Sequence, residues 1–167
     1  MESLKKILKT KLKGAKRIAV LGVGSELRGD DVAGDLVARE LESGCKYKCK
    51  SPEARFFFGA TAPENLTGEI KKFKPSHLII IDSAELGSKP GTVKVLAPKD
   101  IGGVSFLTHR LPTKIMVDYL QKSLDCKVLV IGIQPKSLDF GKQPSKEVKK
   151  SAGLVSAAIK EALQAQS

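Results

Sequence analysis

Apolar segments of two kinds alternate along this chain. Five short runs are rich in β-branched or aromatic residues and predict strands, at residues 18–21, 55–58, 78–81, 92–96 and 127–133. Apolar residues at helical spacing predict helices before, between and after them, at 1–17, 31–41, 63–73, 112–120 and 144–165. The sequence therefore predicts an α/β protein, a three-layer α/β/α sandwich with a mostly parallel sheet of about five strands.

The polarity of these segments predicts which of them lie inside. The run at 78–81 is the most hydrophobic of the chain and predicts a central strand, followed by a loop from Ser83 to Pro90. The run at 92–96 has lysine and proline beside it, as edge strands often do. A chain of 167 residues suits one domain, spanning 1–167. In the helix at 112–120, the residues expected to face the core are Ile115, Met116, Tyr119 and Leu120.

The segment from Arg17 to Leu41 joins a predicted buried strand, a glycine-rich turn and two adjacent carboxylates. Asp30 and Asp31 stand at the start of a helix and at the carboxyl end of a central strand, where open α/β sheets bind ligands. Either Asp can cap the helix, but one cap needs only one side chain. A dinucleotide is not expected, because Leu27 replaces the third glycine of a phosphate-binding turn and two anions would repel phosphate. A cation is the better partner.

Two further residues are candidate ligands of the same cation as Asp31. Asp82 directly follows the run at 78–81, so parallel strands would place it at the same rim as Asp31. His109 precedes a predicted helix on a loop, where binding residues are common, although a structural histidine is an equal alternative. Two carboxylates and an imidazole suit a transition metal such as nickel, with positions left open for water or substrate. His77 precedes its strand and is expected on the surface of the opposite rim.

The composition narrows the classes of partner. The net charge of +11 could attract nucleic acid, yet the chain has no Trp, two Tyr and no basic stretch interleaved with aromatic residues. A solvated lysine coat is the simpler interpretation, and no nucleic-acid partner is expected. No apolar run approaches the ~20 residues of a membrane span, and residues 1–17 lack a secretory core. We therefore expect a cytoplasmic protein with no membrane partner. Its odd cysteine count favours reduced thiols at Cys45, Cys49 and Cys126.

Four motifs occur in order over nearly the whole chain: GVGSELRGDDVAG at 22–34, IIIDSAELGSKPG at 79–91, FLTHRLP at 106–112 and IGIQP at 131–135. Together they resemble the nickel–iron hydrogenase maturation endopeptidases. The segment GATAPEN at 59–65 is similar to the branch that processes the hydrogenase of formate hydrogenlyase-type complexes. Ser25 stands where that family usually has Asn, and Val32 where it commonly has Gly.

The resemblance implies a protease that removes a C-terminal extension from the hydrogenase large-subunit precursor after nickel insertion. It also implies that Asp31, Asp82 and His109 form the nickel-recognition site. We expect these residues to be catalytic as well, the nickel to arrive with the precursor, and the enzyme to be a monomer. The chain has no His-Glu-x-x-His helix and no nucleophile elbow, and no Ser or Cys stands beside a plausible base. Metal-assisted hydrolysis, with a carboxylate as base, is the mechanism that these observations leave.

Two alternatives belong to other classes. One is a non-catalytic metal-sensing or checkpoint protein of the same fold, which would use the same ligand types without cleavage. The other, a nucleotide- or RNA-binding domain, is disfavoured by the missing phosphate loop. If the chain is the protease, we expect the precursor to dock on loops 22–29, 59–65 and 99–110. The lysine-rich segments 1–17 and 142–160 are expected to lie elsewhere and to add little specificity.

Overall fold

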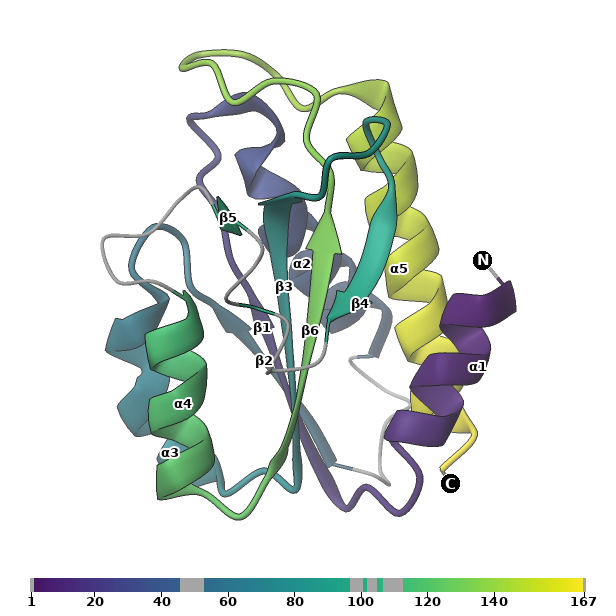
Figure 1. The fold of residues 1–167 in the computed structure, drawn as a ribbon. Helices are drawn as coiled ribbons and strands as arrows, with labels where there is room; N and C mark the ends of the chain where they lie inside the picture. Colours follow the sequence, from purple (N-terminus) through teal and green to yellow (C-terminus); the bar gives the residue numbers. More distant parts are fainter. Residues whose placement is uncertain (1, 46–52, 97–100, 102–104, 107–112, 167) are drawn as a thin grey trace.

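A computed structural model describes residues 2–45, 53–96, 101, 105–106 and 113–166. At its centre lies a sheet in the order β2 (Glu53–Phe58), β1 (Arg17–Gly22), β3 (His77–Glu85), β6 (Lys127–Ile133) and β4 (Val93–Leu96) (Figure 1). The first four strands are parallel, β4 is an antiparallel edge strand, and the short β5 (Ser105–Phe106) pairs with the end of β3. The predicted mostly parallel sheet is confirmed, with residues 92–96 at its edge as expected.

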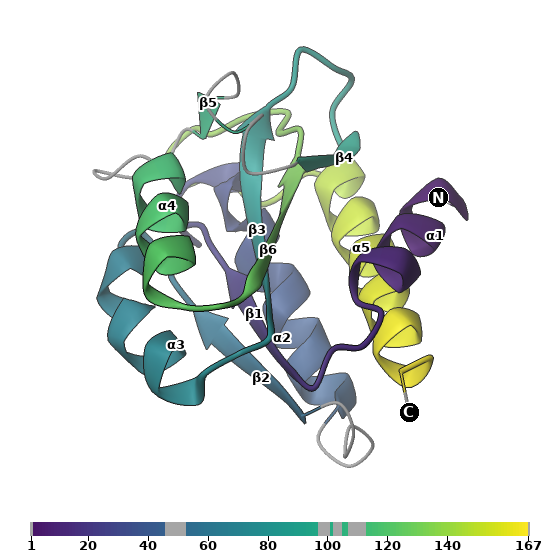
Figure 2. The ribbon, with the colours of Figure 1, turned by 60° about the horizontal axis from the view of Figure 1, so that its bottom comes forward.

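Helices cover both faces of this sheet. On one face lie α1 (Glu2–Lys11), α2 (Ala33–Cys45) and α5 (Lys146–Gln164), and on the other lie α3 (Thr67–Phe73) and α4 (Thr113–Ser123) (Figures 1 and 2). Two short 3₁₀ turns, η1 (Gly29–Val32) and η2 (Pro63–Leu66), lead into α2 and α3. The predicted three-layer α/β/α arrangement is confirmed. Within the described ranges, no helix has both the length and the apolar character to cross a bilayer.

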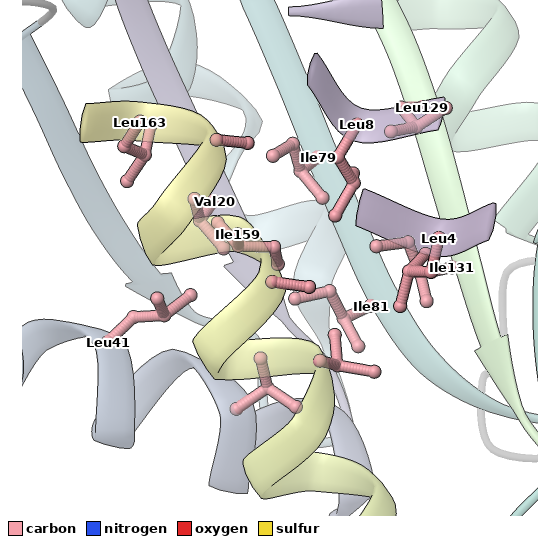
Figure 3. Packing of buried hydrophobic residues seen from close by; sticks show 14 of the residues in the cluster. Leu4, Leu8, Val20, Leu41, Ile79, Ile81, Leu129, Ile131, Ile159 and Leu163 are labelled. Atoms are coloured by element: carbon pink, nitrogen blue, oxygen red, sulfur yellow. The ribbon is translucent and has the colours of Figure 1, made fainter. Parts of the chain in front are cut away.

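The central strand β3 divides its apolar residues between the two faces, because successive strand side chains point to opposite sides. Ile79 and Ile81 pack with α1, α2 and α5, whereas Leu78 and Ile80 pack with α3 and α4. All four are fully buried. Burial of each such side chain contributes about 1.5–3 kcal/mol, so the apolar run at 78–81 fixes the middle of the sheet. Figure 3 shows Ile79 and Ile81 against α5 and α1.

The N-terminal helix α1 packs on α5 rather than standing apart. Leu4 and Leu8 are buried in the core of this face (Figure 3). At its surface, Lys5 Nζ and Lys9 Nζ lie 2.6 and 2.7 Å from the carboxylate of Glu161 on α5. These two lysines lower the pKa of Glu161 to about 2. The lysines of 1–17 thus form a surface coat over an apolar stripe, as the sequence predicted.

Three expectations about local structure were wrong. β3 does not end before Asp82 but continues to Glu85, because Asp82 and Ser83 still pair with β6 and the next two residues pair with β5. The predicted loop from Ser83 therefore starts only after Glu85.

The other two wrong expectations concern the burial of His77 and of the residues on α4. His77 lies at the predicted opposite rim but is only 5% exposed. It lines a cavity of about 330 Å³ together with Leu12 and Cys126. Burial there lowers the pKa of its imidazole. On α4 the buried residues are Met116, Val117 and Leu120, whereas Ile115 and Tyr119 are about half exposed. The apolar stripe is therefore narrower and rotated relative to the prediction.

Candidate active site

The loops after β1 and β2 meet beside the carboxyl end of β3. Backbone hydrogen bonds run from Val23 N–H to the Ile81 carbonyl (2.9 Å), from Gly59 N–H to Gly22 (2.8 Å) and from Gly24 N–H to Ala60 (2.9 Å). The turn after β1 is thereby fixed between β3 and the loop after β2. Loops 22–29 and 59–65 lie at one rim, as the sequence predicted.

Two glycines allow this turn to close against the start of α2. Gly24 has a φ of +136°, and a Cβ there would lie 1.7 Å from the Asp31 carbonyl oxygen. A Cβ at Gly34 would lie 2.0 Å from the Ile81 carbonyl oxygen. Any side chain at either position would push η1 and α2 away from the strands. These glycines therefore set where Asp31 stands.

The Asp31 carboxylate is held in one place by donors from two different elements. The Ser25 N–H donates to Oδ2 at 3.0 Å, and the Ser83 hydroxyl donates to Oδ1 at 3.1 Å. Asp31 is only 1% exposed. Two donors on separate oxygens fix the orientation of the carboxylate. The rim therefore carries a pre-positioned anionic group between β1 and β3.

Asp82 stands beside this contact on β3 and is fully buried. It is the neighbour of Ser83, so the two side chains point to opposite sides of the strand. Ser83 faces Asp31, and Asp82 faces the side that α3 and α4 cover. The structure thus places Asp31 and Asp82 at the same end of β3, while His109 lies outside the described residues.

Carboxylate oxygens are suitable ligands for a divalent metal. Among the residues that the structure describes, no three His, Cys, Asp or Glu side chains gather as a metal site. Asp31 and Asp82 are two of the three predicted ligands, and the third, His109, is not among the described residues.

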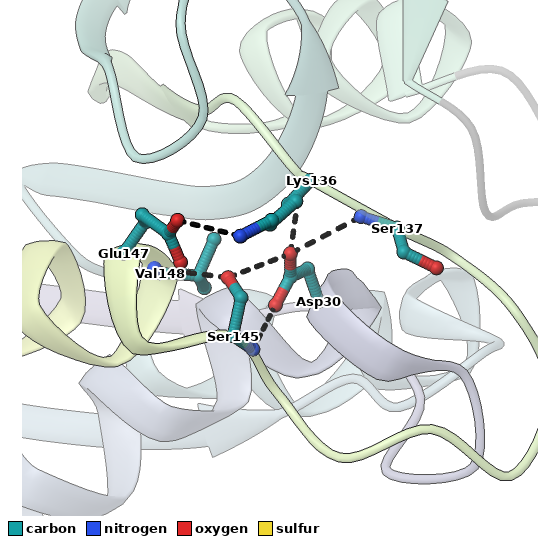
Figure 4. Close-up of polar contacts among 6 residues, drawn as sticks. All are labelled: Asp30, Lys136, Ser137, Ser145, Glu147 and Val148. Carbon is teal, nitrogen blue, oxygen red and sulfur yellow. Dashed lines mark hydrogen bonds and ion pairs between the residues drawn. The ribbon is translucent and has the colours of Figure 1, made fainter.

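Asp30 has a different role from its neighbour. Its carboxylate accepts hydrogen bonds from the N–H groups of Lys136 (2.7 Å), Ser137 (3.3 Å) and Ser145 (2.5 Å), and from the Ser145 hydroxyl (2.9 Å) (Figure 4). Ser145 is the N-cap of α5, and its hydroxyl accepts from Val148 N–H at 3.3 Å. Asp30 thus caps the loop after β6 rather than its own helix, which explains why two adjacent Asp residues occur here.

Sequence reasoning missed three supporting residues. Ser25 and Ser83 were not recognised as donors to Asp31, although continued alternation along β3 would have indicated a polar residue facing the rim. Gln134 in the IGIQP motif is also structural: its Oε1 accepts from Leu86 N–H at 2.7 Å, and its Nε2 donates to Glu85 at 3.1 Å. Gln134 thereby fixes the turn that follows β3.

One further prediction was wrong. The lysine-rich segment 142–160 does not lie wholly away from this rim, because the Lys142 carbonyl accepts a hydrogen bond from Gly29 N–H at 3.2 Å. Lys142 and Lys146 line a hollow of about 480 Å³ together with Asp30. The start of α5 therefore belongs to the surface around the candidate site.

The fold and the sequence have clear relatives. A family model described as hydrogenase maturation protease (HycI) matches residues 37–165. The Hydrogenase 3 maturation protease of Escherichia coli K12 is 31% identical over 122 residues, which cover 72% of this chain and 74% of that protein. A Methanocaldococcus jannaschii protein named as a candidate hydrogenase maturation protease is 36% identical over 140 residues, covering 82% and 83% of the two chains.

Solved structures agree with these matches. The crystal structure of a [NiFe] hydrogenase maturation protease HycI from Thermococcus kodakarensis superposes with a TM-score of 0.83 at 30% identity. The superposition covers 95% of this chain and 99% of the other. The solution structure of the endopeptidase HycI from Escherichia coli gives a TM-score of 0.74 at 27% identity, with 87% and 90% covered.

Proposed function

The chain belongs to the hydrogenase maturation protease family and is a peptidase, and on that premise we propose that it removes the C-terminal extension of a nickel–iron hydrogenase large-subunit precursor after nickel insertion. The observation that supports this most directly is the buried Asp31 carboxylate, which Ser25 and Ser83 hold at the carboxyl rim of the sheet. That rim is where α/β sheets bind their ligands.

In this proposal nickel is part of the substrate, and Asp31, Asp82 and His109 bind it. The donor types suit the metal, since carboxylates and imidazole are common ligands of divalent transition metals. Asp31 is pre-positioned by two hydrogen bonds, so little reorganisation is needed when the precursor arrives. The precursor carries this metal only after nickel insertion. Recognition of the metal would therefore prevent cleavage before that step.

The reaction is the hydrolysis of one peptide bond, in which water adds to the carbonyl carbon and the leaving nitrogen takes a proton. A metal close to the scissile bond can polarise the carbonyl or lower the pKa of a water. A carboxylate at the rim then accepts the proton from that water. Asp30 is a poor choice for this base, because its oxygens already accept four hydrogen bonds from the loop after β6. Whichever of Asp31 and Asp82 keeps an oxygen that does not bind the metal is the better candidate.

The experiment is to mix the purified chain with nickel-loaded and nickel-free precursor and to detect the released C-terminal peptide by mass spectrometry. We expect release from the loaded precursor only. Equal release from both forms would contradict nickel recognition while leaving the protease assignment intact. Binding of the loaded precursor without any release would instead support the non-catalytic checkpoint alternative.

A further inference from the structure

The loops after β1 and after β6 are joined into one surface beside Asp31. Gly141 N–H donates to the Leu27 carbonyl (2.8 Å), Asp30 N–H to Ser137 (2.9 Å) and Gly29 N–H to Lys142 (3.2 Å). The Asp30 carboxylate adds four hydrogen bonds from the second loop (Figure 4). We call residues 25–30 and 136–142 together the rim platform. Figure 1 shows both of its loops beyond the carboxyl ends of the strands.

The rim platform exposes two large apolar side chains. Phe140 is 77% exposed and Leu27 is 62% exposed, the highest values for large hydrophobic residues in the part of the chain that the structure describes. A single exposed apolar residue is ordinary on a protein surface. Here the two most exposed ones stand on adjacent backbones that hydrogen bonds fix in place. Rigid loops that present apolar side chains are typical of protein-binding surfaces.

Charged side chains of both signs lie close to the rim platform. Lys142 and Lys146 line the hollow beside Asp30, and among the described residues neither has an ion-pair partner. Lys136, by contrast, is paired with Glu147 at 2.7 Å. The same hollow is also lined by the carboxylate of Asp139, the neighbour of Phe140, so charge by itself does not set the sign of the partner surface.

The rim platform is also continuous with the candidate site. Ser25 donates its N–H to Asp31 at 3.0 Å, and its hydroxyl accepts from Leu27 N–H at 3.2 Å. A protein bound over Leu27 therefore lies two residues from the group that holds Asp31. We propose that the rim platform is a docking surface for the large-subunit precursor, which contacts Leu27 and Phe140 with apolar side chains. This inference rests on the proposed function, because it takes its partner from it.

Binding and cleavage are measured separately, so that the two proposals can fail separately. The test variant is Leu27→Gln with Phe140→Gln, and the control is Ile7→Gln with Leu154→Gln, two exposed apolar residues on α1 and α5. Biolayer interferometry with immobilised nickel-loaded precursor should show a dissociation constant about tenfold larger for the test variant and unchanged for the control. Circular dichroism confirms that both variants are folded.

Three outcomes would overturn the docking surface. The test variant could bind the precursor as tightly as the wild type does, or the wild type could fail to bind it at all. Sedimentation could show that the wild type forms dimers and that the test variant does not, which would assign the patch to a second copy of the chain. If the wild type binds the precursor and loses binding in the test variant but never releases the C-terminal peptide, the docking surface stands and the proposed cleavage fails.

Discussion

The Ser83 hydroxyl on β3 donates a hydrogen bond of 3.1 Å to Asp31 within η1, which lies 52 positions earlier in the sequence. This contact connects the central strand of the sheet to the turn after β1. It also fixes one oxygen of the carboxylate, while Ser25 N–H fixes the other. The position of Asp31 therefore depends on the packing of β1 against β3 and not on the local turn alone.

Removal of this contact should reduce both activity and stability. Ser83→Ala removes the hydroxyl donor to Oδ1 of Asp31, and the loss of one buried hydrogen bond costs about 1–3 kcal/mol of unfolding free energy. We expect processing of loaded precursor to slow by about tenfold, since a carboxylate that rotates is less often in the productive position. Ser156→Ala, another buried serine on α5, is the control and should leave the processing rate unchanged. Equal rates in both variants would show that Ser83 has no positioning role.

The two adjacent carboxylates should respond in opposite ways to substitution. Asp31→Asn keeps the shape of the side chain and should abolish processing with little loss of stability. Asp30→Ala leaves the N–H groups of Lys136, Ser137 and Ser145 without their acceptor and should lower the unfolding free energy by about 3 kcal/mol. Urea denaturation and the peptide-release assay together measure both effects. A stable, fully active Asp30→Ala variant would contradict the structural role of that residue.

The strands were predictable from sequence because their signal is local. Each parallel strand is buried on both faces, so Ile79 and its neighbours form a continuous apolar run that needs no knowledge of the rest of the chain. The role of Asp30 was not predictable, since its partners Lys136 and Ser145 lie 106 and 115 positions away. The burial of His77 likewise depends on what packs over the start of its strand, which includes Leu12 beyond α1.

The candidate site was also predictable only in part. The sequence pointed to the carboxyl rim because a glycine turn and two carboxylates follow a buried strand at Asp30 and Asp31. It could not decide which of these carboxylates is structural, because that depends on which one the loop after β6 reaches. It also placed the end of β3 too early, since a charged residue such as Asp82 is uncommon inside a buried strand.

The buried His77 should make stability depend on pH. Burial, with Lys127 nearby, lowers the pKa of its imidazole below the ordinary value of 6.5, so the folded protein binds this proton less readily than the unfolded chain does. Stability from this source is therefore fully present above about pH 6.5 and falls as the pH drops through and below that value. Urea unfolding at pH 7.5 and pH 5.5 should show the loss in wild type, and His77→Gln should make it smaller. An identical pH dependence in both proteins would exclude His77 as its source.

Chelation separates a metal that arrives with the substrate from one that the enzyme holds. In the proposed function the nickel arrives with the precursor. The isolated chain should therefore contain almost no metal after treatment with EDTA and buffer exchange. It should still cleave loaded precursor at the untreated rate, because the nickel is buried in the precursor. A stoichiometric, tightly held zinc in the purified protein, with activity lost on its removal and restored by its return, would identify a conventional metalloprotease. In that case Asp31 and Asp82 would be ligands of a resident metal instead of sensors of the nickel in the precursor.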